Sequence, residues 1–342
     1  MKILITGNLG YIGSVLTSRI DKNLFEIEGL DIGYYKDCYF SEVKSEFKQI
    51  FMDLRDIESK DIKGYDGIIH LPSLSNDPLG ELKPKLTKEI NYQSTLKLAK
   101  LAKLSGVKRF VYASSQSMYG ISNKNEELDE DNSDKNPITT YAKTKWEAEI
   151  ELRKLSDNNF IVSCFRPSTV FGSSPRLRCD IVFNNLLASA YTLGKIEILS
   201  DGTPWRPVIH VNDVCDAFLS GLIAPQDLVG GHAFNVGIRN GNFMVSDLAK
   251  VAQRLVPGCE IFIVGDHTDA RTYKVSFKKI FTRLKDYFHP KWNLNNGGQE
   301  LIEYFKEIDF NQDMFKNRYF NRLNQLKNLK KNNIINHNLR WI

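Results

Sequence analysis

The chain has 342 residues, of which 42% are hydrophobic and 25% are charged, so it can bury a sizeable core and is not globally disordered. No stretch approaches the roughly 18 consecutive apolar residues of a membrane helix, and the first residues lack the apolar segment of a secretory signal. Five dispersed cysteines without a CxxC pair fit a reducing cytosol better than a disulfide framework. We therefore expect a cytoplasmic protein with no membrane partner.

The net charge of +5 lies at one end of the chain. Residues 311–342 contain seven Lys or Arg, one Asp and nine Asn, a net +6, which leaves about −1 for residues 1–310. Because the body is nearly neutral and the tail lacks the motif of an RNA-binding module, we predict no nucleic-acid partner. The six histidines show no paired spacing, so we predict no metal site.

Apolar runs and helical patterns alternate through the first half of the chain. A predicted buried strand over 2–6 precedes a predicted helix over 11–20. This alternation predicts an α/β fold, a doubly wound parallel sheet with helices on both faces. The other predicted strands cover 25–31, 48–52, 67–71, 109–113 and 160–165, and the other helices cover 86–104 and 140–155.

After about residue 166 the alternation loosens. No linker rich in Pro, Gly or Ser interrupts the chain, so we expect a second, smaller lobe packed on the first. The predicted division is 1–175, then 176–310 with some interleaved segments, then a basic, partly helical extension over 311–342. In the second half, short strands are expected at 196–199, 232–236 and 260–264, and helices at 180–191, 211–222, 246–255 and 299–305.

A glycine-rich loop follows the first predicted strand and opens the first predicted helix. In this GxxGxxG pattern, one glycine allows the turn, one lets the backbone approach a pyrophosphate, and one lets helix and strand pack closely. Asp31 ends the next strand, near the spacing of about 20 residues at which a carboxylate binds ribose hydroxyls and repels a 2′-phosphate. We therefore predict NAD rather than NADP. The predicted loop comprises Gly7, Asn8, Leu9, Gly10, Tyr11, Ile12 and Gly13.

Tyr141 and Lys145 are four residues apart on a predicted helix, so they share one face at about 5–6 Å. A phenol with a reference pKa near 10 needs a nearby positive charge to act as a base at pH 7. Ser115 follows the strand at 109–113 and would reach the same substrate from the carboxyl edge of the sheet. We predict Ser115, Tyr141 and Lys145 as the catalytic residues.

With these motifs, the chain resembles the extended short-chain dehydrogenase/reductases, specifically the NAD-dependent nucleotide-sugar epimerase/dehydratase group that includes UDP-glucose 4-epimerase. The resemblance implies a Rossmann-type NAD-binding domain and a smaller, mixed C-terminal lobe for a nucleoside diphosphate sugar. It implies that Tyr141 is the base for the sugar 4-hydroxyl and that Lys145 binds the nicotinamide ribose. The segments that carry it are 6–13, 53–55, 115–120, 141–145, 166–172 and 206–214.

The same resemblance implies further ligand contacts. For the cofactor it implies Asp53, Leu54, His70, Leu71, Pro72, Asn91 and Arg166, although Pro72 departs from the usual alanine. For the substrate it implies Ser115, Gln116, Ser117, Thr169, Asn185, Arg206 and Arg271, the two arginines because guanidinium pairs phosphate oxygens bidentately. Arg176 and Arg178 either reach a ligand or lie in a solvated turn.

The sequence leaves two reactions possible after oxidation at C4, that of a 4-epimerase and that of a 4-dehydrogenase. A 4,6-dehydratase needs an Asp–Glu pair where this chain has Gln116 and Ser117, so dehydration is disfavoured. A 4-epimerase would reduce the keto sugar from its other face, whereas a 4-dehydrogenase would release it. The segment at 174–178 resembles dehydrogenases of nucleotide-activated heptoses. A non-catalytic NAD-binding module is disfavoured because Ser, Tyr and Lys are all present, and the resemblance implies a homodimer built from the helices at 86–104 and 140–155.

Overall fold

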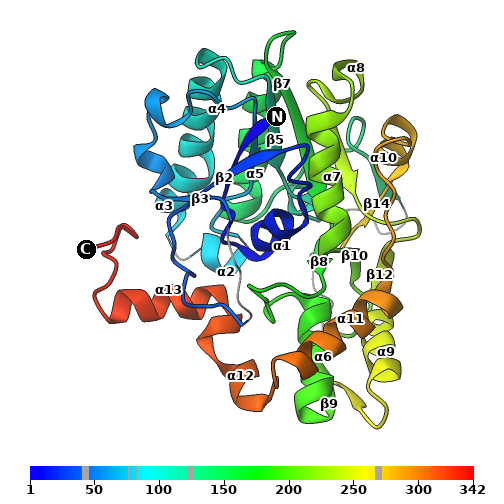
Figure 1. Cartoon of the computed structure of the whole chain (residues 1–342). Helices are drawn as coiled ribbons and strands as arrows, with labels where there is room; N and C mark the ends of the chain where they lie inside the picture. Colours follow the sequence, from blue (N-terminus) through cyan, green and yellow to red (C-terminus); the bar gives the residue numbers. More distant parts are fainter. Residues whose placement is uncertain (41–45, 76, 82, 122–125, 266–271) are drawn as a thin grey trace.

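A computed structural model of the chain describes residues 1–40, 46–75, 77–81, 83–121, 126–265 and 272–342. At its centre, seven of the described strands form a parallel sheet in the order β3-β2-β1-β4-β5-β7-β11 (Figure 1). This confirms the predicted doubly wound sheet, whose order reverses between β1 and β4, where such sheets bind ligands. The strands are β1 (Lys2–Thr6), β2 (Glu26–Asp31), β3 (Lys48–Phe51), β4 (Gly67–His70), β5 (Arg109–Ala113), β7 (Ile161–Pro167) and β11 (Ala233–Val236).

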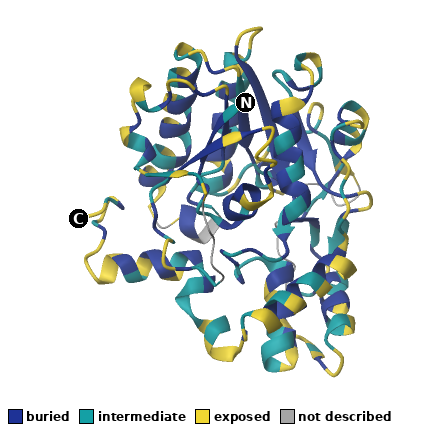
Figure 2. Ribbon diagram, viewed as in Figure 1, coloured by how far each residue is buried: buried dark blue, intermediate teal, exposed yellow. Residues whose placement is uncertain are grey.

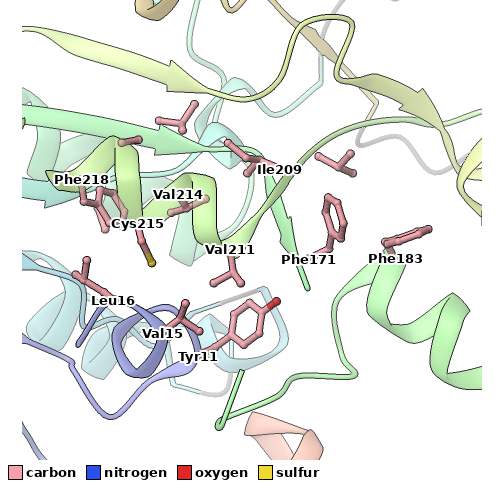
Figure 3. Packing of buried hydrophobic residues seen from close by; sticks show 14 of the residues in the cluster. Tyr11, Val15, Leu16, Phe171, Phe183, Ile209, Val211, Val214, Cys215 and Phe218 are labelled. Atoms are coloured by element: carbon pink, nitrogen blue, oxygen red, sulfur yellow. The ribbon is translucent and has the colours of Figure 1, made fainter. Parts of the chain in front are cut away.

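Alternate residues of the strands face two helical layers, as the period of two requires. Ile3 and Ile5 belong to the core shared with helices α1 and α7, which Figure 3 shows packed together, whereas Leu4 belongs to the core shared with α4 and α5. Figure 2 shows the sheet buried between these layers. The helices are α1 (Tyr11–Arg19), α7 (Val211–Ile223), α4 (Ser94–Leu104) and α5 (Thr140–Leu155).

The prediction of a single helix over 86–104 is wrong. The structure divides it into α3 (Pro84–Lys88), a π-helical turn η3 (Glu89–Gln93) and α4. Ser94 donates to the carbonyl of Ile90 at 2.6 Å, and the Asn91 side chain reaches the distant backbone of Leu74. The spacing of apolar residues in the sequence does not predict such side-chain contacts. Single π-helical turns are frequent at functional sites.

The second lobe is built from small sheets and helices below the carboxyl edge of the central sheet (Figure 1). The strand predicted at 232–236 is β11, which pairs with β7 and so belongs to the central sheet. Strands β8, β10 and β12 escaped prediction. The strands of this lobe are β8 (Thr169–Phe171), β9 (Lys195–Ile198), β10 (Trp205–His210), β12 (Asn242–Met244), β13 (Glu260–Ile263) and β14 (Lys274–Val275), the last paired with β6 (Glu127–Leu128). Its helices are α6 (Val182–Leu193), α9 (Val245–Leu255) and α11 (Leu294–Glu307). Helix α10 (Lys278–Arg283) packs instead against β11 of the central sheet, and two short helices, α2 (Asp77–Gly80) and α8 (Gln226–Val229), lie elsewhere.

The C-terminal extension returns to the first lobe. After α12 (Gln312–Lys316) and α13 (Arg322–Lys331), the chain ends beside the loop that follows β2, in red in Figure 1. Trp341 Nε1 donates to the carbonyl of Ile32 at 2.7 Å, and the Tyr34 hydroxyl donates to the carbonyl of Leu339. Among the described helices, none is long and apolar enough to cross a membrane.

Candidate active site

The glycine-rich loop lies between β1 and α1 at the carboxyl edge of the sheet. Gly7 has φ +75°, and a Cβ there would lie 2.8 Å from the backbone nitrogen of Pro72. A Cβ on Gly13 would lie 2.4 Å from the carbonyl oxygen of Gly7, so helix and strand can approach this closely only with glycine. The free N–H groups at the start of α1 therefore face a cradle of the right form for a pyrophosphate.

Asp31 ends β2 next to this loop. Its carboxylate accepts hydrogen bonds from the backbone N–H of Gly33 at 2.7 Å and of Leu9 at 3.3 Å. Burial raises the pKa of Asp31, and these hydrogen bonds oppose that shift. The carboxylate is thus fixed against the loop, and these residues fit a dinucleotide whose adenosine ribose lies over Asp31.

Asp53 and Leu54, which the resemblance implies as cofactor contacts, follow the end of β3. The Asp53 carboxylate is bound by the Arg55 guanidinium, with Nε at 2.9 Å, and by Arg340 of the extension at 3.3 Å. Leu54 packs into the core beneath. Asp53 therefore joins the C-terminal extension to this side of the site.

His70 is placed differently from the prediction. Its imidazole is fully buried, with Nδ1 2.8 Å from the Thr6 hydroxyl and Nε2 2.8 Å from the Thr95 hydroxyl. Burial lowers the pKa of His70 well below its usual value, so the ring is neutral. Its side chain therefore holds β4 against its neighbours instead of lining the cofactor groove, which leaves the following backbone at Leu71 and Pro72 for that role.

Asn91 supports the same edge from the π-helical turn. Its amide oxygen accepts from the backbone N–H of Leu74 at 2.8 Å, and its amide nitrogen lies 3.4 Å from the Thr144 hydroxyl on α5. The side chain thereby links the segment after β4 to the helix that carries Tyr141.

Arg166 does not face the cofactor, and the prediction is corrected. Its side chain is 0% exposed and binds Glu149 through Nε at 3.0 Å and Nη2 at 2.6 Å. Its third nitrogen, Nη1, donates to the Tyr119 hydroxyl at 2.8 Å. With all three nitrogens bound inside the core, Arg166 fixes α5 to β7.

The predicted catalytic residues lie where β5 ends and α5 begins. Tyr141 is in the first turn of α5, which Thr139 caps by accepting from the N–H of Ala142 at 3.2 Å. Lys145, one turn later, is 3% exposed and donates to the carbonyl of Ala113 at 2.8 Å. Burial lowers the pKa of Lys145 to about 7. Ser115 lies just after β5, with its hydroxyl 2.8 Å from that of Ser117.

A cavity of about 180 Å³ is lined by Ser117 and Ala142, which are near neighbours of Ser115 and Tyr141 in the sequence. Ser115, Tyr141 and Lys145 are not themselves in its lining. The cavity contains three of the predicted substrate residues, Ser117, Thr169 and Arg206, which come from separate parts of the chain. Tyr273, Thr139 and Ile138 were missed, although Tyr273 lies only two positions beyond the predicted Arg271. The lining residues are Ser117, Gly120, Ile138, Thr139, Ala142, Thr169, Arg206 and Tyr273.

The other predicted substrate residues lie apart from this lining. Gln116 is buried behind it and donates to the carbonyl of Arg166 at 3.0 Å. Asn185 is exposed on α6 and donates to the carbonyl of Cys179 at 2.9 Å. Arg271 lies outside the described residues.

Comparison with known proteins defines the class of this site. The chain belongs to the NAD dependent epimerase/dehydratase family, which matches residues 3–237. This confirms the resemblance seen in the motifs and the prediction of NAD as cofactor.

Similar proteins in this family carry out different reactions. A UDP-glucose 4-epimerase of Mycolicibacterium smegmatis is 28% identical over 250 residues, 69% of this chain and 77% of the relative. A dTDP-D-glucose 4,6-dehydratase of Mus musculus is 26% identical over 327 residues, 90% of this chain and 89% of the relative. The structure of a UDP-glucuronic acid 4-epimerase from Bacillus cereus, in complex with UDP-glucuronic acid and NAD, superposes with a TM-score of 0.75 at 20% identity and covers 90% of this chain and 100% of that one.

Proposed function

We propose that the protein is a nucleoside diphosphate sugar 4-epimerase. The observation that carries this proposal is the cavity lined by Ser117 and Ala142, near neighbours in sequence of Ser115 and Tyr141, whose described lining contains no Asp or Glu. Elimination of water from a keto sugar needs a carboxylic acid and a base, whereas epimerisation needs only oxidation and reduction at C4. The lining therefore favours a reaction that stays at C4.

NAD, when bound, accepts the C4 hydride and returns it. Tyr141 removes the proton of the sugar 4-hydroxyl, and the Ser115 hydroxyl hydrogen-bonds the same oxygen. Lys145 stabilises the phenolate through its charge, an attraction that is strong because the local dielectric constant is low. The phenolate in turn favours the protonated lysine against the burial that lowers the Lys145 pKa to about 7. The keto sugar then rotates so that its opposite face is reduced. Tyr141 returns the proton to the C4 oxygen, and the C4 configuration is inverted.

Arg206 and Tyr273 at the far side of the cavity suit a nucleoside diphosphate. Guanidinium binds phosphate oxygens bidentately, and a phenol ring offers a stacking face for a base or sugar. The similar M. smegmatis and B. cereus proteins are named for UDP-glucose and UDP-glucuronic acid, which supports a UDP-sugar as the first substrate to test.

One experiment separates epimerase from dehydrogenase. Purified protein is incubated with UDP-, GDP-, dTDP- and CDP-sugars, heptoses included, while absorbance follows NADH and chromatography follows the sugar. Epimerised sugar without net NADH supports the proposal. Accumulating NADH with release of a keto sugar would establish the 4-dehydrogenase instead.

Tyr141→Phe tests the assigned base. We expect turnover to fall by about 100-fold or more with NAD still bound, since a positioned base contributes roughly 10²–10⁴. Tyr287→Phe, which removes a hydroxyl away from the cavity lining, is the matched control. Full activity in Tyr141→Phe would show that another group is the base.

We also propose a homodimer through the outer faces of α4 and α5. The support for this proposal is the family resemblance, which implies a dimer contact through these two helices. Light scattering at micromolar concentration should give twice the mass of 39.2 kDa, and a monomeric mass would contradict the proposal.

A further inference from the structure

The segment from Ser173 to Asp180 crosses the carboxyl edge of the central sheet. At its start, the Ser174 hydroxyl donates to the carbonyl of Tyr11 at 2.8 Å and lies 3.0 Å from the Ser14 hydroxyl, both in α1. At its end, Arg178 Nη1 lies 3.3 Å from the Ser75 hydroxyl, beyond β4. The segment therefore runs from the glycine-rich loop toward the catalytic side, across the predicted cofactor groove.

Arg176, in the middle of this segment, is buried against Tyr39, whose phenol favours the charged guanidinium. Its residue exposure is 0%, and within the described chain none of its three guanidinium nitrogens has a partner. The guanidinium stacks on the Tyr39 ring, with Cζ 3.3 Å from the ring centroid. Leaving a cation and its N–H groups unsatisfied in the core is costly, because water is lost without replacement.

Two other arginines with little exposure show that the fold satisfies such groups elsewhere. Arg178 pairs with Asp180 through Nε at 2.8 Å and Nη2 at 3.0 Å, and Arg166 pairs with Glu149. Arg176 differs because no carboxylate among the described residues forms an ion pair with it, which leaves its buried charge without a counterion there.

A second arginine comes from the C-terminal extension. Arg322 at the start of α13 is 3% exposed, and its Nη2 donates to the carbonyl of Arg176 at 3.0 Å. Its Nη1 is buried and lacks a partner within the described chain, and its guanidinium lies over the Tyr35 ring at 4.3 Å. The contact fixes the backbone of Arg176 and adds a second positive charge.

Both charges act on the adenosine end of the cofactor groove. Arg176 and Arg322 favour the ionised form of Asp31, although burial raises the pKa of that carboxyl overall. Asp31 itself binds the N–H of Leu9 in the glycine-rich loop. The backbone next to Arg176 is joined to the glycine-rich loop, because the Ser174 hydroxyl accepts from the N–H of Arg176 at 3.0 Å and donates to the carbonyl of Tyr11. The nine-residue helix α1 begins in that loop, with its first N–H groups unpaired within the helix.

We propose that Arg176 binds the diphosphate of the dinucleotide from the side opposite the glycine-rich loop, and that Arg322 positions it. A diphosphate supplies the two negative charges and the acceptor oxygens that both surfaces lack. The C-terminal extension is then part of the cofactor site. This inference concerns the family's cofactor and does not depend on the sugar or on the reaction after C4 oxidation.

Arg176→Met tests the inference by calorimetry on protein freed of nucleotide. Dissociation constants are measured for ADP-ribose, for adenosine and for UDP. We expect ADP-ribose to bind about 10- to 100-fold more weakly, because a charged hydrogen bond is worth about 1.5–3 kcal/mol, while adenosine and UDP are unchanged. Arg254→Met, an exposed arginine on α9, is the matched control.

Thermal unfolding of the nucleotide-free protein separates binding from structure. Removing an unsatisfied buried cation should leave Tm unchanged or raise it, whereas a structural guanidinium would lower Tm when it is removed. An unchanged affinity for ADP-ribose, an equal loss for adenosine, or a loss confined to UDP would overturn the proposal.

Two milder variants guard against misfolding. Arg176→Lys keeps the charge but loses the planar fork, so we expect an intermediate loss of ADP-ribose affinity. Arg322→Lys should weaken ADP-ribose less than Arg176→Met does, since Arg322 acts through Arg176. Wild-type affinity in Arg176→Lys together with a larger loss in Arg322→Lys would contradict the assigned roles. None of these readouts involves sugar turnover, so failure of the 4-epimerase proposal would leave them intact.

Discussion

Replacing Glu149 with Gln should strongly destabilise the protein, because the Glu149 carboxylate balances the charge of the buried Arg166 side chain. Both side chains are 0% exposed. Glu149 accepts from Arg166 Nε and Nη2 and also from the Ser114 hydroxyl at 2.6 Å. Ser114 precedes Ser115, and Glu149 lies one turn beyond Lys145, so the pair also sets the distance between the two catalytic segments.

The expected magnitude follows from the burial. The neutral amide in Glu149→Gln would leave the guanidinium uncompensated, which costs about 3–5 kcal/mol for a fully buried pair. Unfolding entropy of about 2.1 cal/mol/K per residue gives roughly 0.7 kcal/mol/K for this chain, so Tm should fall by roughly 4–7 °C. Turnover should fall as well, since Ser115 and Tyr141 lose their common support.

Urea unfolding and calorimetry measure this loss. Glu151→Gln is the matched control, because Glu151 lies on the same helix, is 41% exposed and pairs only with Lys154 among the described ion pairs; it should change stability by less than about 0.5 kcal/mol. The double change Glu149→Met with Arg166→Met should recover part of the loss, since it removes both charges. A loss below about 1 kcal/mol in Glu149→Gln, or a double variant worse than the single one, would refute the reasoning.

Two further predictions concern the loop and the lysine. Gly13→Ala should weaken NAD by about tenfold or more, because backbone atoms 2.4 Å from the new Cβ must move; Gly194→Asn, in open space at a left-handed helix end, should leave NAD affinity unchanged, and a loss there too would argue against a local cause. Lys145→Met should flatten the pH dependence of stability. With the pKa of Lys145 lowered to about 7 in the folded state and 10.5 as reference, the unfolded chain holds the extra proton between these values, so wild-type stability rises with pH, by about 2 kcal/mol from pH 7 to pH 9. Urea unfolding of the nucleotide-free proteins checks this, and equal slopes in both would contradict it.

Local patterns predicted the site best where chemistry depends on spacing along the chain. The glycine-rich loop opens α1, and the structure places Tyr141 and Lys145 one turn apart on α5 as their spacing required. The family resemblance implied Ser117, Thr169 and Arg206 as substrate residues, and they line one cavity. In these cases the residue type and its neighbours contain the information.

The errors fall on residues whose partners are distant in sequence. Arg166 was assigned to the cofactor, but each of its three nitrogens is hydrogen-bonded to Glu149 or Tyr119. His70 lies between two threonines from other elements. No local pattern shows that a polar side chain is already satisfied, because satisfaction depends on which elements pack together.

The sequence by itself determined the parallel α/β architecture, the family and the NAD loop, because strand periodicity and glycine geometry are local properties. The tertiary structure alone decided which cations are free. Of the arginines considered for ligand binding, Arg166 is neutralised inside the core, whereas Arg176 is buried without an ion pair among the described residues. Only the tertiary structure places the basic tail, since Trp341 donates to the carbonyl of Ile32 after β2 and Arg322 donates to the carbonyl of Arg176. The contacts that place the tail span 146 or more residues, which only the folded chain brings together.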